Sequence, residues 1–412
     1  MRRLTVIFAP CLLLLSACAG SGGGGVADSD SSASAPEASA SFDGGADMTA
    51  PALFKADSVL AGMTLEEKVG QCFMPSIYAQ ADPYTLRRLR EYVSDLHVGG
   101  VVLLKGDLQS AAKMGSIAAE APVPLFVAID AEWGLGMRLE DAPDFPRNGR
   151  ISPKADEQLL FDYGREVARE SRRVGINMIL GPVVDVVENP RGIIGSRSFG
   201  NDPRRVADLG VAYARGVESG RVISVAKHFP GHGSPSADSH RSLPVIERSL
   251  QQLDSIDLYP FRSYIDAGLS GIMAGHLAVP AIDPEALPAA VSPVVIGRLL
   301  RGDLEFKGLV LTDALNMAGA QGHDAAAAIA AGADIVVAPE DTRHEIDTMI
   351  AQVRKGSLPL RDLDDRVRRI LFYKYLIADP SASASASADS LSLSTLYRDI
   401  HPSDSLYHRL SQ

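Results

Sequence analysis

Short apolar runs alternate with amphipathic stretches along most of the chain, and no other feature limits the possible folds as strongly. Each run is bounded by polar or turn-forming residues and has the length of a buried strand. We predict strands at 70–75, 99–104, 125–130, 177–185, 223–228, 271–276, 308–313 and 334–339. About eight βα units in one body of this size predict an α/β fold, a (β/α)8 TIM-type barrel that forms a single catalytic domain.

The stretches between these runs carry signals of helix formation. Thr64, followed three residues later by Glu67, has the pattern of a capping box. Apolar residues recur at helical spacing over 160–168. Ser292 before Pro293 has the pattern of an N-cap with proline in the first helical position. We therefore predict helices at all three places.

Polar residues stand at or just after the carboxyl ends of five predicted strands. They are Asp130, Asp185, His228, His276 and Asp313. A single aspartate there would be explained as the N-cap of the next helix. Five such positions at one end of a barrel are better explained by an active site, because barrels of this type carry their active sites on that face.

The loop 227–240 holds three histidines and one aspartate among prolines and glycines that exclude helix and strand. Asp238 and His240 are two residues apart, so the carboxylate could bond one imidazole nitrogen and leave the other free to move a proton. A metal site that uses His228 and His232, or an ordinary solvated loop, fits the spacing as well. From the residues alone all three interpretations stay open.

The two ends of the chain differ from its body in composition. Residues 1–17 have two arginines and an apolar stretch, as in a secretory signal peptide, and end before Cys18 in the manner of a lipoprotein box. We expect lipid on Cys18, a flexible Gly/Ser/Ala tether over 18–50 and a location on a membrane of the bacterial cell envelope, facing the periplasm or the cell surface. The folded body spans 51–378, and 379–412 is a low-complexity linker with a C-terminal tail, either a remnant or a docking strap.

Charge and cysteine content exclude some classes of partner and bond. The formal net charge is -11 and no basic cluster occurs, which argues against nucleic acid. Of three cysteines, Cys11 and Cys18 belong to the signal region, so Cys72 has no partner for an intrachain disulfide after processing. Neutral substrates such as sugars remain open, and we expect a monomer.

Several motifs together resemble glycoside hydrolase family 3, in its β-N-acetylhexosaminidase branch. They are Lys-His-Phe-Pro-Gly-His-Gly at 227–233 with Asp-Ser-His at 238–240, Gly-Pro-Val-Val-Asp-Val at 181–186, Gly-Ser-Arg-Ser-Phe-Gly at 195–200 and Leu-Thr-Asp-Ala-Leu-Asn-Met at 311–317. The resemblance covers about residues 55–378 and follows the order of the family's motifs.

The resemblance implies a role for each matching residue. Asp313 matches the nucleophile, and His240 matches a histidine acid/base that Asp238 orients, which implies a retaining mechanism through a glycosyl ester. The implied substrate-binding residues, which would contact sugar hydroxyls, are Asp130, Arg138, Arg197, Lys227 and His228. No cofactor and no metal are implied.

The predicted activity is that of an exo-acting β-N-acetylglucosaminidase on peptidoglycan fragments or chitin-type oligosaccharides. A β-N-acetylglucosaminide phosphorylase and a non-catalytic cell-wall-binding lipoprotein are the alternatives. If His240 only binds substrate, the acid/base would be sought at Glu132 or Glu188. Trp133, the single tryptophan, stands where many relatives carry glycine, so it could stack on a sugar or pack on the barrel rim.

Overall fold

A computed structural model describes residues 49–151, 153–233, 243–320, 322–378 and 404–412, all within one compact unit, 36–412. The predicted signal peptide, the lipidation site Cys18, most of the tether and the linker 379–403 lie outside the described residues. So do Asp238 and His240, the predicted acid/base pair.

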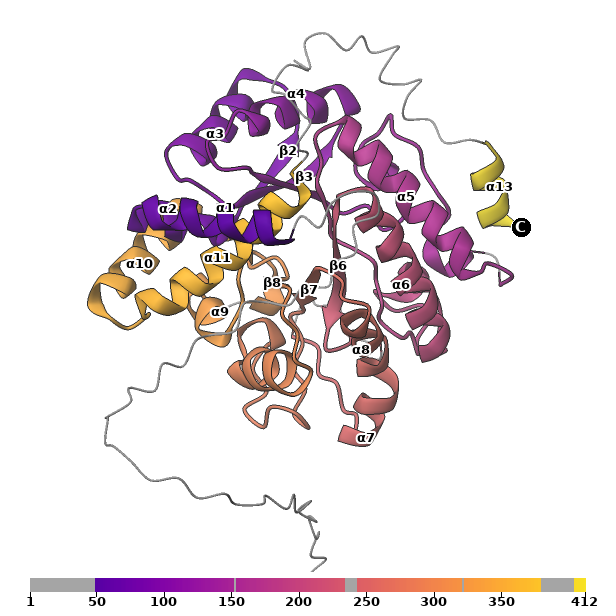
Figure 1. Ribbon diagram of the computed structural model, residues 1–412. Helices are drawn as coiled ribbons and strands as arrows, with labels where there is room; N and C mark the ends of the chain where they lie inside the picture. Colours follow the sequence, from indigo (N-terminus) through magenta and orange to yellow (C-terminus); the bar gives the residue numbers. More distant parts are fainter. Residues whose placement is uncertain (1–48, 152, 234–242, 321, 379–403) are drawn as a thin grey trace, which may run out of the picture. The chain divides into compact units, whose positions relative to one another are not determined.

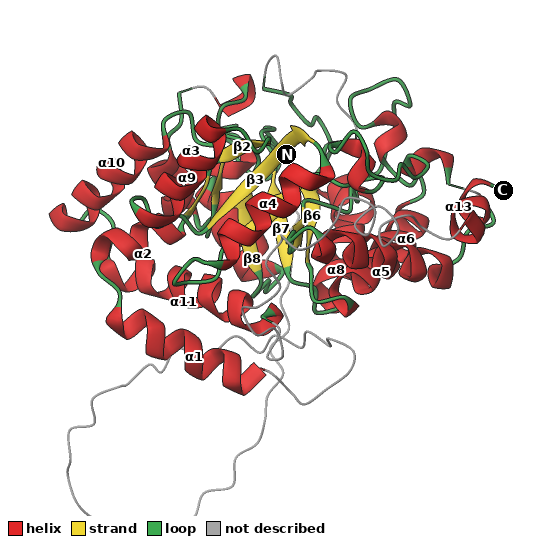
Figure 2. Ribbon diagram, turned by 90° about the horizontal axis from the view of Figure 1, so that it is seen from above, coloured by secondary structure: helices red, strands yellow, loops and turns green. Residues whose placement is uncertain are grey.

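A parallel sheet of seven strands occupies the centre of this unit, with helices around it (Figures 1 and 2). In spatial and chain order the strands are β2 (Ser76–Ala79), β3 (Gly100–Gly106), β4 (Phe126–Ile129), β5 (Met178–Ile179), β6 (Ile223–Phe229), β7 (Gly271–Ala274) and β8 (Leu309–Thr312). All except β2 overlap a predicted run. Every residue of β4, β6, β7 and β8 is buried, as expected of parallel strands covered on both faces.

Two further parallel strands, β1 (Phe73–Met74) and β9 (Val336–Val337), pair with each other. Backbone hydrogen bonds connect this pair to the larger sheet: Thr312 N of β8 donates to Ile335 O at 3.0 Å, and Gly99 N, just before β3, donates to Phe73 O at 3.0 Å. The protein therefore has an α/β fold with a curled parallel sheet, consistent with a TIM-type domain.

The helices follow the strands in alternation. They are α1 (Thr49–Gly62), α2 (Leu65–Gln71), α3 (Pro83–Ser94), α4 (Leu108–Ala119), α5 (Glu157–Arg173), α6 (Pro203–Ser219), α7 (Leu250–Gln252), α8 (Leu258–Asp266), α9 (Ala325–Ala331), α10 (Thr342–Lys355) and α11 (Leu360–Ile377). Two further helical segments, η4 (Leu253–Asp257) and η6 (Pro293–Asp303), are π-helices. None of the helices in the described ranges is long and apolar enough to cross a membrane.

The predicted helix signals are found in place, with one correction. The capping box at the start of α2 is formed, because the Thr64 hydroxyl accepts from Glu67 N at 3.2 Å. The Ser292 hydroxyl caps the next segment by accepting from Val295 N at 3.1 Å. That segment is the π-helix η6, however, and not the α-helix that its N-cap and proline suggest.

The C-terminal helix α13 (Asp404–Ser411) packs against α5 (Figure 1). Leu406 and Leu410, four residues apart on one face of α13, are both buried. Arg409 adds a weak ion pair to Asp162 of α5 at 3.8 Å. The C-terminal helix therefore contacts the folded body.

Candidate active site

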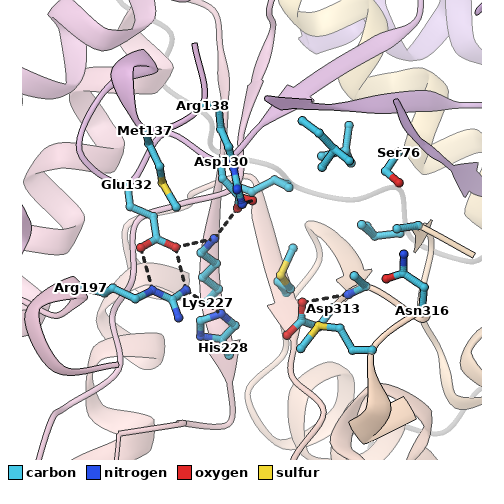
Figure 3. A pocket seen from close by; sticks show the side chains of 18 of the residues that line it. Ser76, Asp130, Glu132, Met137, Arg138, Arg197, Lys227, His228, Asp313 and Asn316 are labelled. Atoms are coloured by element: carbon cyan, nitrogen blue, oxygen red, sulfur yellow. Dashed lines mark hydrogen bonds and ion pairs between the residues drawn. The ribbon is translucent and has the colours of Figure 1, made fainter. Parts of the chain in front are cut away.

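A cavity of about 440 Å³ lies at the carboxyl ends of the strands, a volume suited to a small-molecule ligand (Figure 3). All six predicted site residues within the described ranges line it: Asp130, Arg138, Arg197, Lys227, His228 and Asp313. They come from the ends of β4, β6 and β8 and from two loops, so the fold gathers residues that are far apart in the sequence. Asp238, His240 and Cys18 have no described position.

Asp130 forms one side of the cavity and is held by two cations. Its Oδ1 accepts from Lys227 Nζ at 2.7 Å, and its Oδ2 pairs with Arg138. The short helical turn Leu135–Met137 reverses the chain after β4 and brings Arg138 back to Asp130. Burial alone would raise the pKa of Asp130, but the charges of Lys227 and Arg138 hold it below its usual value.

Glu132 lines the cavity, although the sequence interpretation named it only as an alternative acid/base and not as a binding residue. Its carboxylate takes two hydrogen bonds from Arg197, from Nε at 2.9 Å and from Nη2 at 2.7 Å, and a third contact from Lys227 Nζ at 2.9 Å. Its side chain is fully buried. Burial opposes ionisation, yet Lys227 and Arg197 hold the pKa of Glu132 well below its usual range. A carboxylate so firmly ionised is a poor proton donor, which disfavours Glu132 as the alternative acid/base.

Lys227 joins the two carboxylates from the buried end of β6. Burial alone would lower the pKa of Lys227, but Asp130 and Glu132 raise it above its usual value. The lysine is therefore a cation, and its ammonium group fixes both anions on one side of the cavity (Figure 3). Such a set of charged donors and acceptors suits hydroxyl groups of a sugar.

His228 is oriented by Asp185, a fully buried aspartate behind the cavity wall. Its Nδ1 lies 2.8 Å from Asp185 Oδ2, and its backbone N donates to Oδ1 at 3.1 Å. The backbone N of His232 donates to the same Oδ1 at 2.7 Å. Because a carboxylate only accepts, Nδ1 carries a proton and Nε2 faces Arg197, whose Nη2 lies 3.4 Å away.

Asp313 stands opposite this cluster, just after β8. Its Oδ1 accepts from Ala314 N at 2.8 Å, and its own N donates to Ala274 O at 2.8 Å. The buried ring of His276 donates from Nε2 to Ala314 O at 3.0 Å and so braces the same turn. Burial would raise the pKa of Asp313, but electrostatic interactions with His228 and His276 lower it below its usual value. An ionised carboxylate with one oxygen held in place is a competent nucleophile.

Of the five predicted strand-end residues, three face the cavity and two lie behind it. Asp130, His228 and Asp313 line it, whereas Asp185 and His276 are fully buried and orient the residues in front. Among the described residues, no group of three or more His, Cys, Asp or Glu side chains could hold a metal ion.

Trp133 packs at the rim and also lines the cavity, and its stacking on a sugar stays a prediction. The Arg147 guanidinium lies over its ring, 4.5 Å from the centroid, so the indole is packed at the rim. The same side chain also lines the cavity beside Glu132. A sugar bound there would meet an indole whose outer face is already covered by a cation.

The family model described as the glycosyl hydrolase family 3 N terminal domain matches residues 64–372. The chain belongs to glycosyl hydrolase family 3. Relatives that match over the same body are named beta-hexosaminidase.

Two curated relatives illustrate the match. The chain is 38% identical over 234 residues to a beta-hexosaminidase of Nitrosospira multiformis, which covers 54% of this chain and 66% of the relative. It is 33% identical over 313 residues to a beta-hexosaminidase of Chromobacterium violaceum, with 71% of this chain and 86% of the relative covered. The chain thus spans just under two thirds of the first relative's length.

Solved structures in the family superpose on the same body. A glycoside hydrolase family 3 beta-N-acetylglucosaminidase from a Paenibacillus species has a TM-score of 0.73 at 32% identity, over 84% of this chain and 68% of that one. A beta-N-acetylhexosaminidase from Beutenbergia cavernae has a TM-score of 0.67 at 29% identity, over 76% of this chain and 98% of that one.

Proposed function

We propose that this chain is a retaining exo-β-N-acetylglucosaminidase that releases terminal N-acetylglucosamine from peptidoglycan fragments or chitin-type oligosaccharides. The observation that carries the proposal is the ionised Asp313 carboxylate, which shares one cavity with the Asp130–Lys227–Glu132 cluster. Relatives named beta-hexosaminidase and beta-N-acetylglucosaminidase support the choice of an N-acetylamino sugar.

The residues divide the proposed reaction between them. Asp130 and Lys227 hold hydroxyls of the terminal sugar, so that its anomeric carbon faces Asp313. Asp313 forms an ester bond to that carbon while the glycosidic bond breaks, and His240 gives a proton to the leaving oxygen. His240 then takes a proton from water, which attacks the ester and restores the configuration, while Asp238 stabilises the imidazolium.

A side-by-side assay of four aryl glycosides tests the substrate class. The sugars are N-acetylglucosamine, N-acetylgalactosamine, glucose and xylose, and we expect the N-acetylglucosaminide to be cleaved fastest. The glucoside belongs in the set because a Cellulomonas fimi relative, 30% identical over 83% of this chain, is named a beta-N-acetylglucosaminidase/beta-glucosidase. A preference for glucose would overturn the assignment, and a requirement for phosphate would identify a phosphorylase.

The nucleophile is tested by Asp313→Asn, which keeps the shape of the side chain but cannot form the glycosyl ester. Turnover should be abolished while thermal unfolding stays near that of the unmodified protein. Asp57→Asn is the matched control, because this aspartate pairs with Arg368 at the surface and does not line the cavity. Substantial residual turnover in Asp313→Asn would exclude Asp313 as the nucleophile.

Two further features belong to the same proposal. The hydrogen bonds from Thr312 N to Ile335 O and from Gly99 N to Phe73 O support closure of the sheet into a complete (β/α)8 barrel. The paired strands β1 and β9 would close the gap in the sheet. We also propose removal of the signal peptide 1–17 and lipid on Cys18, so that the tether holds the enzyme at a membrane of the cell envelope. Cys18→Ser should then leave the detergent phase and stay active, whereas unchanged partitioning would count against lipidation.

A further inference from the structure

His232 is a buried histidine that the proposed reaction does not use. Its side chain lines the cavity of Asp313 and is only 2% exposed. Neither ring nitrogen has a hydrogen-bond partner among the described residues. A buried polar atom without a partner costs free energy, and in a ligand-binding cavity this cost is explained if the bound ligand supplies the partner.

The backbone on both sides of the His232 ring is held in place. The N of His232 donates to Asp185 Oδ1 at 2.7 Å, and Glu188 N donates to Gly233 O at 3.1 Å. A side chain at Gly233 would collide with the backbone oxygen of Val186, so the chain packs closely there. The imidazole therefore starts from a fixed point on the cavity wall, as a preorganised binding group does.

The protonation state of His232 limits the kind of group that it can bind. Burial lowers its pKa, and the charge of His228, whose ring packs edge-on with 5.7 Å between the centroids, lowers it further. The ring is therefore neutral near pH 7, with one N–H donor and one acceptor nitrogen. Such a ring suits a neutral polar group, and it can bond either the oxygen or the N–H of an amide.

An apolar side chain, Met273, lies on the same part of the cavity wall, between the hydroxyl-binding cluster and the nucleophile. In the parallel register Met273 of β7 stands beside Lys227 of β6 on one side and Leu311 of β8 on the other. Met273 lines the cavity, and its flexible thioether suits a methyl group. Asp313, just after β8, is close enough to act on the pKa of His232. This part of the wall thus offers a neutral polar ring and an apolar side chain next to the nucleophile.

The substituent on carbon 2 of a bound sugar is the group that fits this part of the wall. The proposed reaction places carbon 1 against Asp313, and hydroxyls on the far side of the ring against Asp130 and Lys227, across the cavity (Figure 3). Carbon 2 lies between these two points of the ring. In an N-acetylamino sugar it carries an acetamido group, which is a neutral amide that ends in a methyl.

We propose that His232 forms a hydrogen bond with the acetamido group on carbon 2, while Met273 packs against its methyl. His232 would thereby select N-acetylamino sugars over sugars with a hydroxyl at that carbon. The inference rests on the proposed function and deepens it, because it takes Asp313 to mark the position of carbon 1.

The affinities of two aryl 1-thio-β-glycosides, which resist hydrolysis, test the proposal without turnover. One carries an acetamido group on carbon 2 and the other a hydroxyl, and calorimetry measures both. We expect the unmodified protein to bind the acetamido compound more tightly. His232→Leu should weaken binding of the acetamido compound about tenfold and that of the hydroxyl compound far less, as loss of one or two neutral hydrogen bonds predicts.

Two further variants separate a contact with the ligand from a structural role. His232→Gln keeps a donor and an acceptor, so it should retain most of the preference for the acetamido compound. His344→Gln is the control, because this exposed histidine of α10 does not line the cavity, and it should change neither affinity. His232→Leu should melt no lower than the unmodified protein, because it removes two buried nitrogens that have no partner.

Equal weakening of both compounds by His232→Leu, together with a lower melting temperature, would make His232 a structural residue and overturn the inference. Unchanged affinities would overturn it as well. Failure of the proposed function would appear elsewhere, as absence of hydrolysis of aryl N-acetylglucosaminides by the unmodified protein. A preference for the acetamido compound that depends on His232, in a protein without hydrolase activity, would uphold the contact and remove the reaction assigned to Asp313.

Discussion

Glu132→Gln removes one buried charge and keeps the shape of the side chain. The substitution therefore tests how much the charge of Glu132 contributes to stability and activity. The Glu132 carboxylate takes two hydrogen bonds from Arg197 and one contact from Lys227. An amide keeps one acceptor oxygen and turns N–H donors toward groups that can only donate. The two cations would then lose a shared counter-ion in a place with little access to water.

The expected loss of stability follows from burial. Removing one partner of a buried ion pair costs about 3–5 kcal/mol, because the remaining charge stays desolvated. Lys227 keeps Asp130, and the Arg197 side chain is 19% exposed, so the cost should fall at the low end, about 3 kcal/mol. The entropy of unfolding of a body that spans 51–378 is about 0.7 kcal/mol/K, so each kcal/mol lowers the melting temperature by about 1.5 °C and Glu132→Gln should melt about 4 °C lower.

Thermal unfolding and kcat/KM on an aryl N-acetylglucosaminide are the two measurements. The matched control is Glu66→Gln, which breaks an exposed ion pair with Arg354 and should cost less than about 1 kcal/mol. kcat/KM should fall in Glu132→Gln and stay constant in the control, because only the former frees Arg197 from its fixed place. If the two variants had the same melting temperature, loss of the buried Glu132 charge would cost no more stability than loss of an exposed one, and the reasoning would be refuted.

The pH dependence of stability should carry the signature of Glu218, since burial raises its pKa to about 7. Glu218 is protonated in the folded chain and ionised in the unfolded chain between pH 4.5 and about 7, so stability falls as pH rises through that window, by up to about 3 kcal/mol. Glu218→Gln keeps an acceptor for Ser224 and Ser270 and should flatten this slope, which melting curves at several pH values would reveal. His240→Ala should slow substrates with poor leaving groups much more than activated aryl glycosides, and Asp238→Asn should show the same pattern more weakly. Equal slowing of both substrate types would make His240 a binding residue.

The positions of the strands could be predicted because each is a short apolar run closed by polar residues. The run over 76–79 was missed, since Ser76–Ala79 alternates buried and exposed positions right after Pro75 and merges with the preceding run. The π-helical form of η6 has no counterpart in the sequence pattern. An N-cap serine followed by proline also begins α-helices, so this pattern does not reveal the wider hydrogen-bond spacing of a π-helix.

Glu132 illustrates what local patterns cannot reveal about the site. Its partner Arg197 is 65 positions away, and a glutamate in a loop has no periodic signal to mark it as buried. One indirect clue was present: the predicted substrate-binding residues included three cations, Arg138, Arg197 and Lys227, but only one anion, Asp130. The balance of charges in a predicted site can therefore indicate a missing residue that the hydrophobic pattern of the sequence does not reveal.

The docking of α13 could not be predicted either, and the reason leads to a further test. Burial of Leu406 and Leu410 contributes about 1.5–3 kcal/mol each. The conformational entropy lost on ordering the helix opposes this gain, so we expect docking to have a small free energy.

Weak docking predicts that the amides of α13 open more often than those of α10, whose residues Ile346, Met349 and Ile350 are buried in the core. Hydrogen exchange of the α13 amides should therefore be clearly faster than that of the α10 amides. Equal protection of the two helices would mean that α13 is held as firmly as the rest of the body, and the inference of a small docking free energy would then be wrong.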